Sequence, residues 1–364
     1  MKTVTTKFIV NLVLILGILC LPQSSFAAPV SFTKDILNDQ NTVYPISATQ
    51  VLIKTKNKLE LVDVQTNTLV KLVSVNQKIL DVQILSNPNK IIIITQTDAG
   101  KIQKGVFSVQ GIQTNEFQYR MNFPKDVEAR WSPPSGKVNE RLMVRQGNRF
   151  NLYSTTKTQP LLTYNAPVDK GIYEYVSLAD WDYSKYPYLV TKYVSDGIMA
   201  SDYEVRVLNL FTKKITVIDR LPIDTGFKVS GNDKLELWNS YIYQDVQPAN
   251  APHPDPTKPQ AFYSVHSLAS GAEISNYSSV FKQSFGQTSG WKTQIAGKYV
   301  CVQDLSTGLW NLYENNGSTV AMAQAGLGKG TWKFLGYNIS ERVCYFIVME
   351  EGDPAPIIKS IKIK

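Results

Sequence analysis

The chain has 364 residues, of which 43% are hydrophobic and 19% charged, and its formal net charge is +8. Length alone would allow two domains, but no linker separates halves of different composition, so we expect one. No run of lysine and arginine is interleaved with aromatic residues, which excludes the usual nucleic-acid signature, and the scattered lysines are typical of a solubilising surface.

The N-terminus has the pattern of a secretory signal. Lys2 and Lys7 come before or at the start of an apolar run over Phe8–Leu21, and Ser25–Ala27 supplies small residues at alternate positions. The apolar run is shorter than the ~20 residues that span a bilayer, and no later segment is long enough. We therefore expect residues 1–27 to be a signal peptide, with a retained anchor as the alternative, and the protein to be secreted or in the cell envelope.

A short phrase recurs through the rest of the chain: a large apolar residue, a few turn-forming residues, then a burst of β-branched and aromatic residues. A period of about 40–50 residues made only of strand-like pieces is typical of a β-propeller. The pattern predicts an all-β fold for residues 28–364, a single propeller domain of seven four-stranded blades. The phrase opens at Ile46, Ile84, Trp131, Trp181, Phe227, Trp291 and Trp332.

The third repeat shows how a blade divides into strands a, b, c and d. Strand a ends near Trp131, and the next three strands are expected over Arg141–Gln146, Arg149–Ser154 and Pro160–Tyr164. The last repeat has room for strands a, b and c only. We predict that Val30–Ile36 supplies the missing strand, so that the N-terminus closes the ring and no sheet edge is left open.

The same repeat carries a resemblance to a known family. Its sequence Trp131-Ser132-Pro133-Pro134-Ser135-Gly136-Lys137, followed by an apolar strand and Asn151-Leu152-Tyr153, resembles the TolB-type propeller repeat, Trp/Phe-Ser-Pro-Asp-Gly-Lys. Residues 85–94 are a second, less complete copy. The aspartate of the motif is replaced here, and the other repeats keep only the large residue and the strand. The resemblance implies a propeller and no particular activity.

Cysteine and tryptophan positions indicate core packing. Cys301 and Cys344 lie in the middle of strands of adjacent repeats, where we expect buried thiols more readily than a disulfide, because facing sheets lie about 10 Å apart. The four tryptophans that open repeats are expected in the core. Trp238 and Trp310 fall outside this register and are the better candidates for exposed aromatics.

Signals for catalysis are few. The two histidines are His253, in a proline-rich loop, and His266, on a strand, and neither stands at metal-ligand spacing from a second ligand. The Gly-x-Ser-x-Gly elbow of a serine hydrolase is missing from the sequence. We therefore predict no metal, no cofactor and no catalytic residue, and consider an enzyme the less favoured interpretation.

Candidate binding residues gather in the b–c connections, which meet at one end of a propeller. Three of these connections are long: Tyr193–Tyr203, Gln244–Gln260 and Glu350–Pro356. Five prolines make the second an extended arm. It is either a tolerated surface excursion or, if it is functional, an arm that rises over this face. The candidate ligand-binding residues on the b–c face are Asp98, Asp196, Asp202, Asp245, His253, Asp255, Glu350, Glu351 and Asp353.

Three functions remain open on the sequence alone. The first is a binding or assembly module, expected to be monomeric, whose acidic face would take a cation, a basic peptide, a protein or a glycan. The second is a lyase or hydrolase acting on polysaccharide through aspartates and tyrosines of the same loops. The third is a structural protein of the cell envelope.

Overall fold

The computed structural model describes the propeller strands and most of their turns. The described residues are 32, 43–47, 49–55, 58–74, 77–85, 90–108, 113–134, 139–170, 174–197, 201–221, 225–230, 233–239, 241–243, 263–276, 290–296, 298–315, 320–338 and 341–363. Across these residues the secondary structure is strand and turn, without a helix. No helix long and apolar enough to span a bilayer is found in this part of the chain. The expected signal peptide lies outside the described residues.

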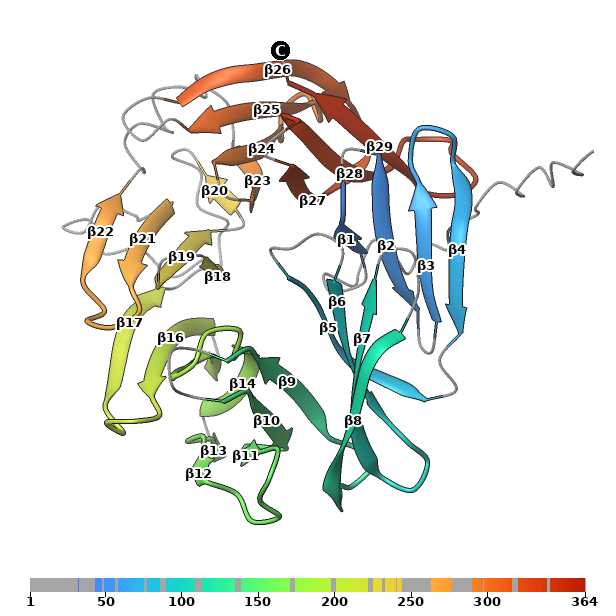
Figure 1. Ribbon diagram of the computed structural model, residues 1–364. Coiled ribbons are helices and arrows are strands. Elements are labelled where there is room, and N and C mark those ends of the chain that lie inside the picture. Colours follow the sequence, from blue (N-terminus) through green and yellow to red (C-terminus); the bar gives the residue numbers. More distant parts are fainter. Residues whose placement is uncertain are drawn as a thin grey trace, which may run out of the picture.

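The strands form seven antiparallel sheets arranged around a common axis as the blades of a propeller (Figure 1). Blades 1 to 3 have four strands each. Strand d of blade 3 begins at Leu162, two residues after the expected Pro160. Their strands are β1 (Val43–Pro45), β2 (Gln50–Thr55), β3 (Lys58–Asp63), β4 (Thr68–Ser74), β5 (Lys78–Ile84), β6 (Lys90–Gln96), β7 (Lys101–Ser108), β8 (Gln113–Asn122), β9 (Glu128–Ser132), β10 (Arg141–Gln146), β11 (Arg149–Ser154) and β12 (Leu162–Asn165).

Blades 4 to 7 have five, four, five and three strands in the described residues. The extra strands are β13, which pairs with β14, and β20, which leaves the fifth repeat and pairs with β23 of blade 6. The strands are β13 (Asp169–Lys170), β14 (Glu174–Asp182), β15 (Tyr188–Gly197), β16 (Ser201–Asn209), β17 (Ile215–Leu221), β18 (Thr225–Ser230), β19 (Lys234–Asn239), β20 (Tyr241–Tyr243), β21 (Tyr263–Ser267), β22 (Glu273–Asn276), β23 (Gly290–Ala296), β24 (Tyr299–Asp304), β25 (Trp310–Asn315), β26 (Val320–Gly328), β27 (Thr331–Asn338), β28 (Val343–Met349) and β29 (Ile357–Lys362).

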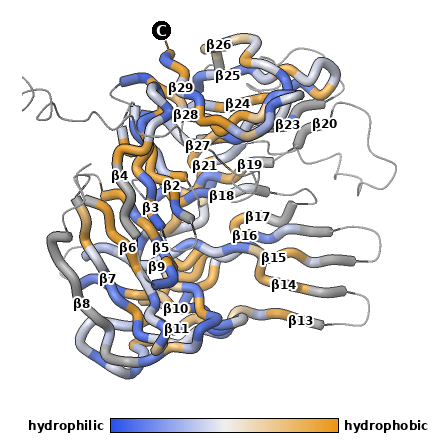
Figure 2. The backbone as a smooth tube through the Cα atoms, turned by 90° about the vertical axis from the view of Figure 1, so that its right-hand side faces the viewer, coloured by the Kyte–Doolittle hydropathy of each residue, from blue (hydrophilic) through white to orange (hydrophobic). Residues whose placement is uncertain are grey.

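The core is a series of apolar clusters, most of them joining strands of neighbouring blades. Trp131 is 2% exposed and packs with residues of blades 2 and 3, and Trp332 is 2% exposed in a cluster shared by blades 6 and 7. Trp181 is also buried, in a cluster shared by blades 3 and 4, so Trp131, Trp181 and Trp332 fill equivalent contacts, as expected. The side chain of Trp291 lies outside the described part of the chain. In Figure 2 the five strands of blade 4 run side by side toward the right of the view.

Blade 7 has strands a, b and c, as the sequence predicts, and packs against blade 1. The Tyr345 hydroxyl of β28 donates a hydrogen bond to the Ser47 carbonyl after β1. Phe32 is 7% exposed and lies in the cluster that joins these two blades. The remainder of the predicted closing strand lies outside the described residues, so strand pairing with β29 stays a prediction.

Candidate functional site

Some of the acidic residues predicted on the b–c connections lie in the described part of the chain and others do not. Asp98 is exposed in the turn between β6 and β7, and Glu351 is exposed in the turn between β28 and β29. Asp245, His253 and Asp255 lie outside the described residues.

The turn between β28 and β29 holds its acids by local contacts. The Glu350 amide donates to Asp353 Oδ2 at 2.9 Å, and the Asp353 amide donates to the Glu350 carbonyl at 3.1 Å. Lys359 Nζ lies 2.6 Å from Glu350 Oε1. Glu350 is therefore neutralised by its own blade, which leaves Glu351 as the exposed acid of this turn.

The prediction of a long loop over Tyr193–Tyr203 was wrong. Strands β15 and β16 continue through most of it, with Ser195 opposite Asp202 and Asp196 opposite Ser201. The segment contains Tyr193, Val194, Ile198 and Tyr203, which are aromatic or β-branched residues that strands favour. Asp196 and Asp202 are thus on adjacent strands of one hairpin.

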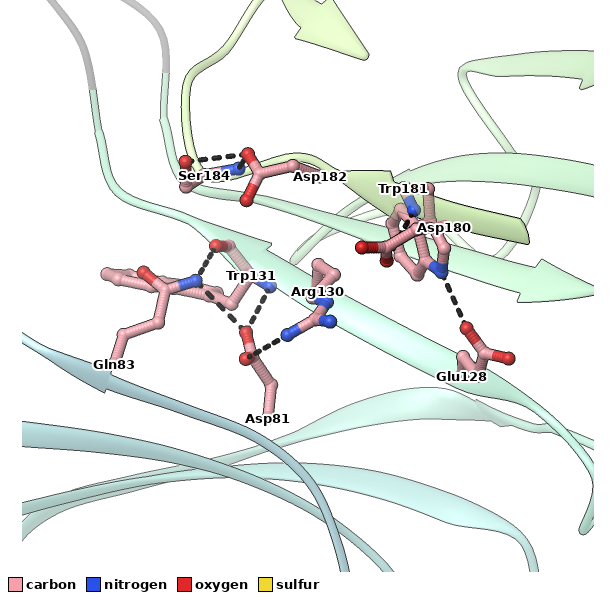
Figure 3. A network of polar contacts seen from close by, with 9 residues as sticks. All are labelled: Asp81, Gln83, Glu128, Arg130, Trp131, Asp180, Trp181, Asp182 and Ser184. Carbon is pink, nitrogen blue, oxygen red and sulfur yellow. Dashed lines mark hydrogen bonds and ion pairs between the residues drawn. The ribbon is translucent and has the colours of Figure 1, made fainter. Parts of the chain in front are cut away.

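Charged side chains come together instead on strand a of blades 2, 3 and 4, which are β5, β9 and β14 (Figure 1). Figure 3 shows this group, which we call the inner polar cluster, with three aspartates around one arginine. It contains none of the nine candidate residues. The inner polar cluster consists of Asp81, Gln83, Glu128, Arg130, Trp131, Asp180, Trp181, Asp182 and Ser184.

Asp81 of β5 links blade 2 to blade 3. The backbone N–H of Trp131 and the Gln83 side chain each donate to Asp81 Oδ2 at 3.0 Å, and Arg130 Nη1 lies 3.4 Å from Asp81 Oδ1. Asp81 is only 3% exposed. A carboxylate this deeply buried needs such partners, because leaving it unpaired would cost several kcal/mol.

Arg130 is also placed against blade 4. Its guanidinium lies 5.6 Å from the centre of the Trp181 ring, within the range of a cation–π contact. The indole N–H of Trp181 donates to Glu128 Oε2, and Arg145 Nη1 lies 3.2 Å from the same carboxylate. The nearby acids, Asp81 first and then Asp182, raise the pKa of Arg130 against an opposing effect of burial.

Asp180 and Asp182 flank Trp181 on β14 and differ from Asp81 in their electrostatics. The pKa of each is raised, chiefly because protein surrounds the carboxylate, against the lowering effect of backbone and side-chain hydrogen bonds. Asp180 accepts the Trp181 N–H at 2.7 Å, and Asp182 accepts the N–H and hydroxyl of Ser184 at 2.8 and 2.7 Å. Asp180 is nonetheless exposed and Asp182 half-buried as whole residues.

A second contact of the same kind joins blades 6 and 7. Gln294 of β23 donates to the Trp332 carbonyl and accepts the Phe334 N–H, just as Gln83 donates to the Trp131 carbonyl. Glutamine at this inner-strand position therefore holds one blade to the backbone of the next. The two contacts also fix which residues of β5 and β23 are equivalent.

Sequence reasoning missed the inner polar cluster although one signal was present. A charged residue immediately precedes the repeat tryptophan at Arg130 and at Asp180, in strands expected to be buried. The prediction for Trp310 was also wrong: it is 1% exposed, and its indole N–H donates to the Gly330 carbonyl at 3.0 Å.

Two further expectations concern the cysteines and metal ligands. Cys301 and Cys344 are free thiols and fully buried, which confirms the expectation of thiols over a disulfide. Burial raises the pKa of both, that of Cys344 to about 12. Among the residues described, no group of three or more His, Cys, Asp or Glu side chains is placed to hold a metal ion.

Comparison with known proteins identifies no family for this chain. No family model matches the chain, and no curated protein does. The solved structures similar to it include the mitotic checkpoint complex, at 8% identity over 94% of this chain and 95% of that chain, with a TM-score of 0.49. Another is Hsv2 of Kluyvelomyces marxianus, at 9% identity over 87% of this chain and 95% of that chain, with a TM-score of 0.40. A third is hydrazine synthase of Kuenenia stuttgartiensis, at 10% identity over 94% of this chain and 98% of that chain, with a TM-score of 0.42.

The sheet order and the ring of inner strands define the class of this protein, a seven-bladed β-propeller. Such a fold is consistent with a binding or assembly module, since propellers commonly mediate interactions and differ in what they bind.

Proposed function

We propose that this propeller is a secreted ligand-binding or assembly module whose site is the inner polar cluster, which lies toward the a–b turns of blades 2 to 4. The observation that carries the proposal is that three aspartates surround one arginine where blades 2, 3 and 4 meet, with Asp180 exposed and Asp182 half-buried, and the pKa of both is raised. Charged groups held in this way are a common feature of functional sites.

Structural need accounts for the other members of the inner polar cluster. Asp81, Gln83 and Arg130 connect neighbouring blades, and Glu128 accepts the Trp181 indole N–H. The hydrogen bonds of Asp180 and Asp182 come from Trp181 and Ser184, within two residues of themselves, and go to Oδ1 of each carboxylate. Both aspartates also interact electrostatically with Arg130 of blade 3. A ligand would bind at Oδ2 of each carboxylate.

Secretion rests on the N-terminal sequence, with its two lysines, apolar run and alternating small residues. It is tested by fusing residues 1–27 to a reporter enzyme that is active only outside the cytoplasm. We expect activity, and loss of activity when Leu14 and Leu16 are both replaced by arginine. A reporter that stays inactive would contradict secretion without affecting the proposed binding site.

The binding proposal is tested with residues 28–364 on an array of glycans and peptides. We expect at least one ligand to be retained by the wild type and lost by Asp182→Asn, with Glu351→Gln, in the exposed b–c turn, as the matched control. Loss with Glu351→Gln alone would move the site to the b–c turns. An array without any bound ligand would overturn the binding proposal.

A further inference from the structure

One hairpin turn of blade 4 departs from a pattern that it shares with three other turns. In each of the four, the side chain of the first residue accepts a backbone N–H two or three residues later. In three of them, the N–H of the fifth residue also donates to the carbonyl of the first, at 2.7 or 2.8 Å. Residues at the same place in these turns can therefore be compared. The four turns join β3 to β4, β16 to β17, β21 to β22 and β24 to β25, and they begin at Asp63, Asn209, Ser267 and Asp304.

The fifth residue of each turn has a left-handed backbone. Its φ is 50° at Asn67, 76° at Gly271 and 73° at Gly308, and asparagine and glycine adopt this conformation readily. A Cβ added to Gly308 would meet no other part of the described chain within 4 Å, so the backbone conformation accounts for glycine there. In blade 4 the fifth residue is Lys213, with a φ of 60°. Lysine is strained in this conformation, and strain that a turn could avoid points to a function.

The third residue is where the turn of blade 4 departs a second time. This residue is exposed in all four turns, and in the other three it is Gln65, Ala269 or Ser306. In blade 4 it is Phe211, which at 81% is the most exposed of the large hydrophobic residues that the structure describes. The same turn forms with glutamine, alanine or serine at this place, so folding does not account for a phenylalanine. Phe211 and Lys213 thus stand two residues apart in one turn, and neither is needed to form it.

The turn of blade 4 is held in place by its own hydrogen bonds. Asn209 Oδ1 accepts the Phe211 N–H at 2.9 Å and the Thr212 N–H at 3.1 Å. The Leu210 N–H donates to the Pro187 carbonyl of the a–b connection at 2.8 Å. Figure 1 shows this turn, between β16 and β17, at the outer edge of the ring. Lys213 and the next residue, Lys214, are both exposed, so a fixed tip carries one exposed ring and two exposed lysines.

We propose that this turn docks the protein on an anionic phospholipid surface, with the Phe211 ring inserted below the headgroups and Lys213 and Lys214 at the phosphates. Apolar rings flanked by lysines are typical of protein segments that lie at a membrane interface, where the long lysine side chain keeps its ammonium group in the polar layer. The positive net charge of the chain attracts it to an extended anionic surface. A bilayer also accepts a single protruding ring without a complementary pocket, which a protein partner would have to supply.

Vesicle binding tests the proposal directly. Residues 28–364 would be sedimented with vesicles of phosphatidylcholine, or of equal parts of phosphatidylcholine and phosphatidylglycerol. We expect binding to the anionic vesicles only, and weaker binding as salt screens the surface charge. Phe211→Ala should weaken binding about tenfold to a hundredfold, because the burial of the ring is lost. Lys214→Gln should weaken it about fivefold.

Lys213→Asn separates binding from folding. Asn67 shows that asparagine fits this place in the turn, so the urea midpoint of the variant should be at least that of the wild type, while vesicle binding weakens about fivefold. A lower midpoint would mean that Lys213 serves the fold and would overturn the proposal. Two matched controls should bind as the wild type does: Met322→Ala, 52% exposed on β26, and Lys329→Gln, exposed between β26 and β27.

The outcomes separate a lipid surface from other partners and from the inner polar cluster. The proposal is overturned if neither kind of vesicle binds, if both bind equally, or if the controls weaken binding as much as Phe211→Ala does. If no vesicle binds but a displayed library of acidic peptides is retained by the wild type and lost by Phe211→Ala, the turn docks a protein instead of a lipid. Asp182→Asn should bind vesicles as the wild type does, so failure here leaves the proposed function standing.

Discussion

Phe32 offers a direct test of how the ring closes. Its side chain is 7% exposed and packs in the cluster that contains Tyr345 and Ile347 of β28 and Val51 of β2, which are themselves fully buried. Replacing a phenylalanine in such a setting by alanine removes its buried surface and leaves a cavity, at a cost of about 3–5 kcal/mol. Because chain ends can shift to fill part of the space, we expect about 3 kcal/mol for Phe32→Ala.

The free energy of unfolding would be measured for residues 28–364 by urea titration followed by tryptophan fluorescence. Phe211→Ala is the matched control, since Phe211 is 81% exposed and its loss should change stability by no more than about 0.5 kcal/mol. If Phe32→Ala costs no more than this control, the N-terminal segment does not help to hold blades 1 and 7 together and the reasoning fails.

Deleting residues 28–36 distinguishes a packed side chain from a paired strand. If the segment completes blade 7, its deletion exposes the edge of β29 and costs clearly more than Phe32→Ala, and it should also promote aggregation through the open edge. Equal losses for the deletion and the substitution would mean that Phe32 packs without a strand around it.

The remaining predictions concern ionisable groups. The pKa of Asp180 and of Asp182 is raised in the folded chain. Above about pH 4 the folded state therefore binds more protons than the unfolded state, and the free energy of unfolding falls as the pH rises from there until both aspartates are ionised in the folded state. Asp180→Asn/Asp182→Asn should remove part of that fall in urea titrations at pH 4 to 7, whereas an identical pH slope would contradict it. The thiols of Cys301 and Cys344 should resist Ellman's reagent at pH 8 in the native protein and both react in guanidinium chloride. Lys104→Met, which leaves a mostly buried glutamate without its ion pair, should cost about 3 kcal/mol in the same titrations, and a loss below about 1 kcal/mol would show that the pair contributes little.

The strands of the propeller could be predicted from the sequence because each blade repeats the same local pattern. Strands b and c of the third repeat, Arg141–Gln146 and Arg149–Ser154, begin and end where expected. Alternation and turn residues are local signals, and a blade is built of consecutive hairpins, so local signals suffice. The segment Tyr193–Tyr203 misled us because a strand that projects beyond the ring has the polar composition of a loop.

The inner polar cluster could not be predicted because its contacts join distant parts of the chain. Arg130 reaches Asp81 from 49 positions away, and Trp181 reaches Glu128 from 53. Whether two such residues meet depends on the angle between blades and on a register shift such as the one between Leu178 and Asp180. Neither the angle between blades nor a register shift can be predicted from the residues of a single strand or turn.

The members of the inner polar cluster differ in how far their contacts offset the free energy of burying a charge, and this difference indicates which of them serve a function. A propeller needs only packing and hydrogen bonds between its inner strands, and Asp81 meets that need, because its partners satisfy both carboxylate oxygens. Asp180 and Asp182 do not meet that need. Their raised pKa means that, at neutral pH, the favourable interactions of the charged carboxylates in the folded protein do not offset the cost of burying them. Charged groups that cost stability in this way are where local rules of folding are expected to fail for functional reasons. A positive group brought by a ligand would lower both pKa values, so the binding energy available at this site is largest at neutral pH, where both carboxylates are charged.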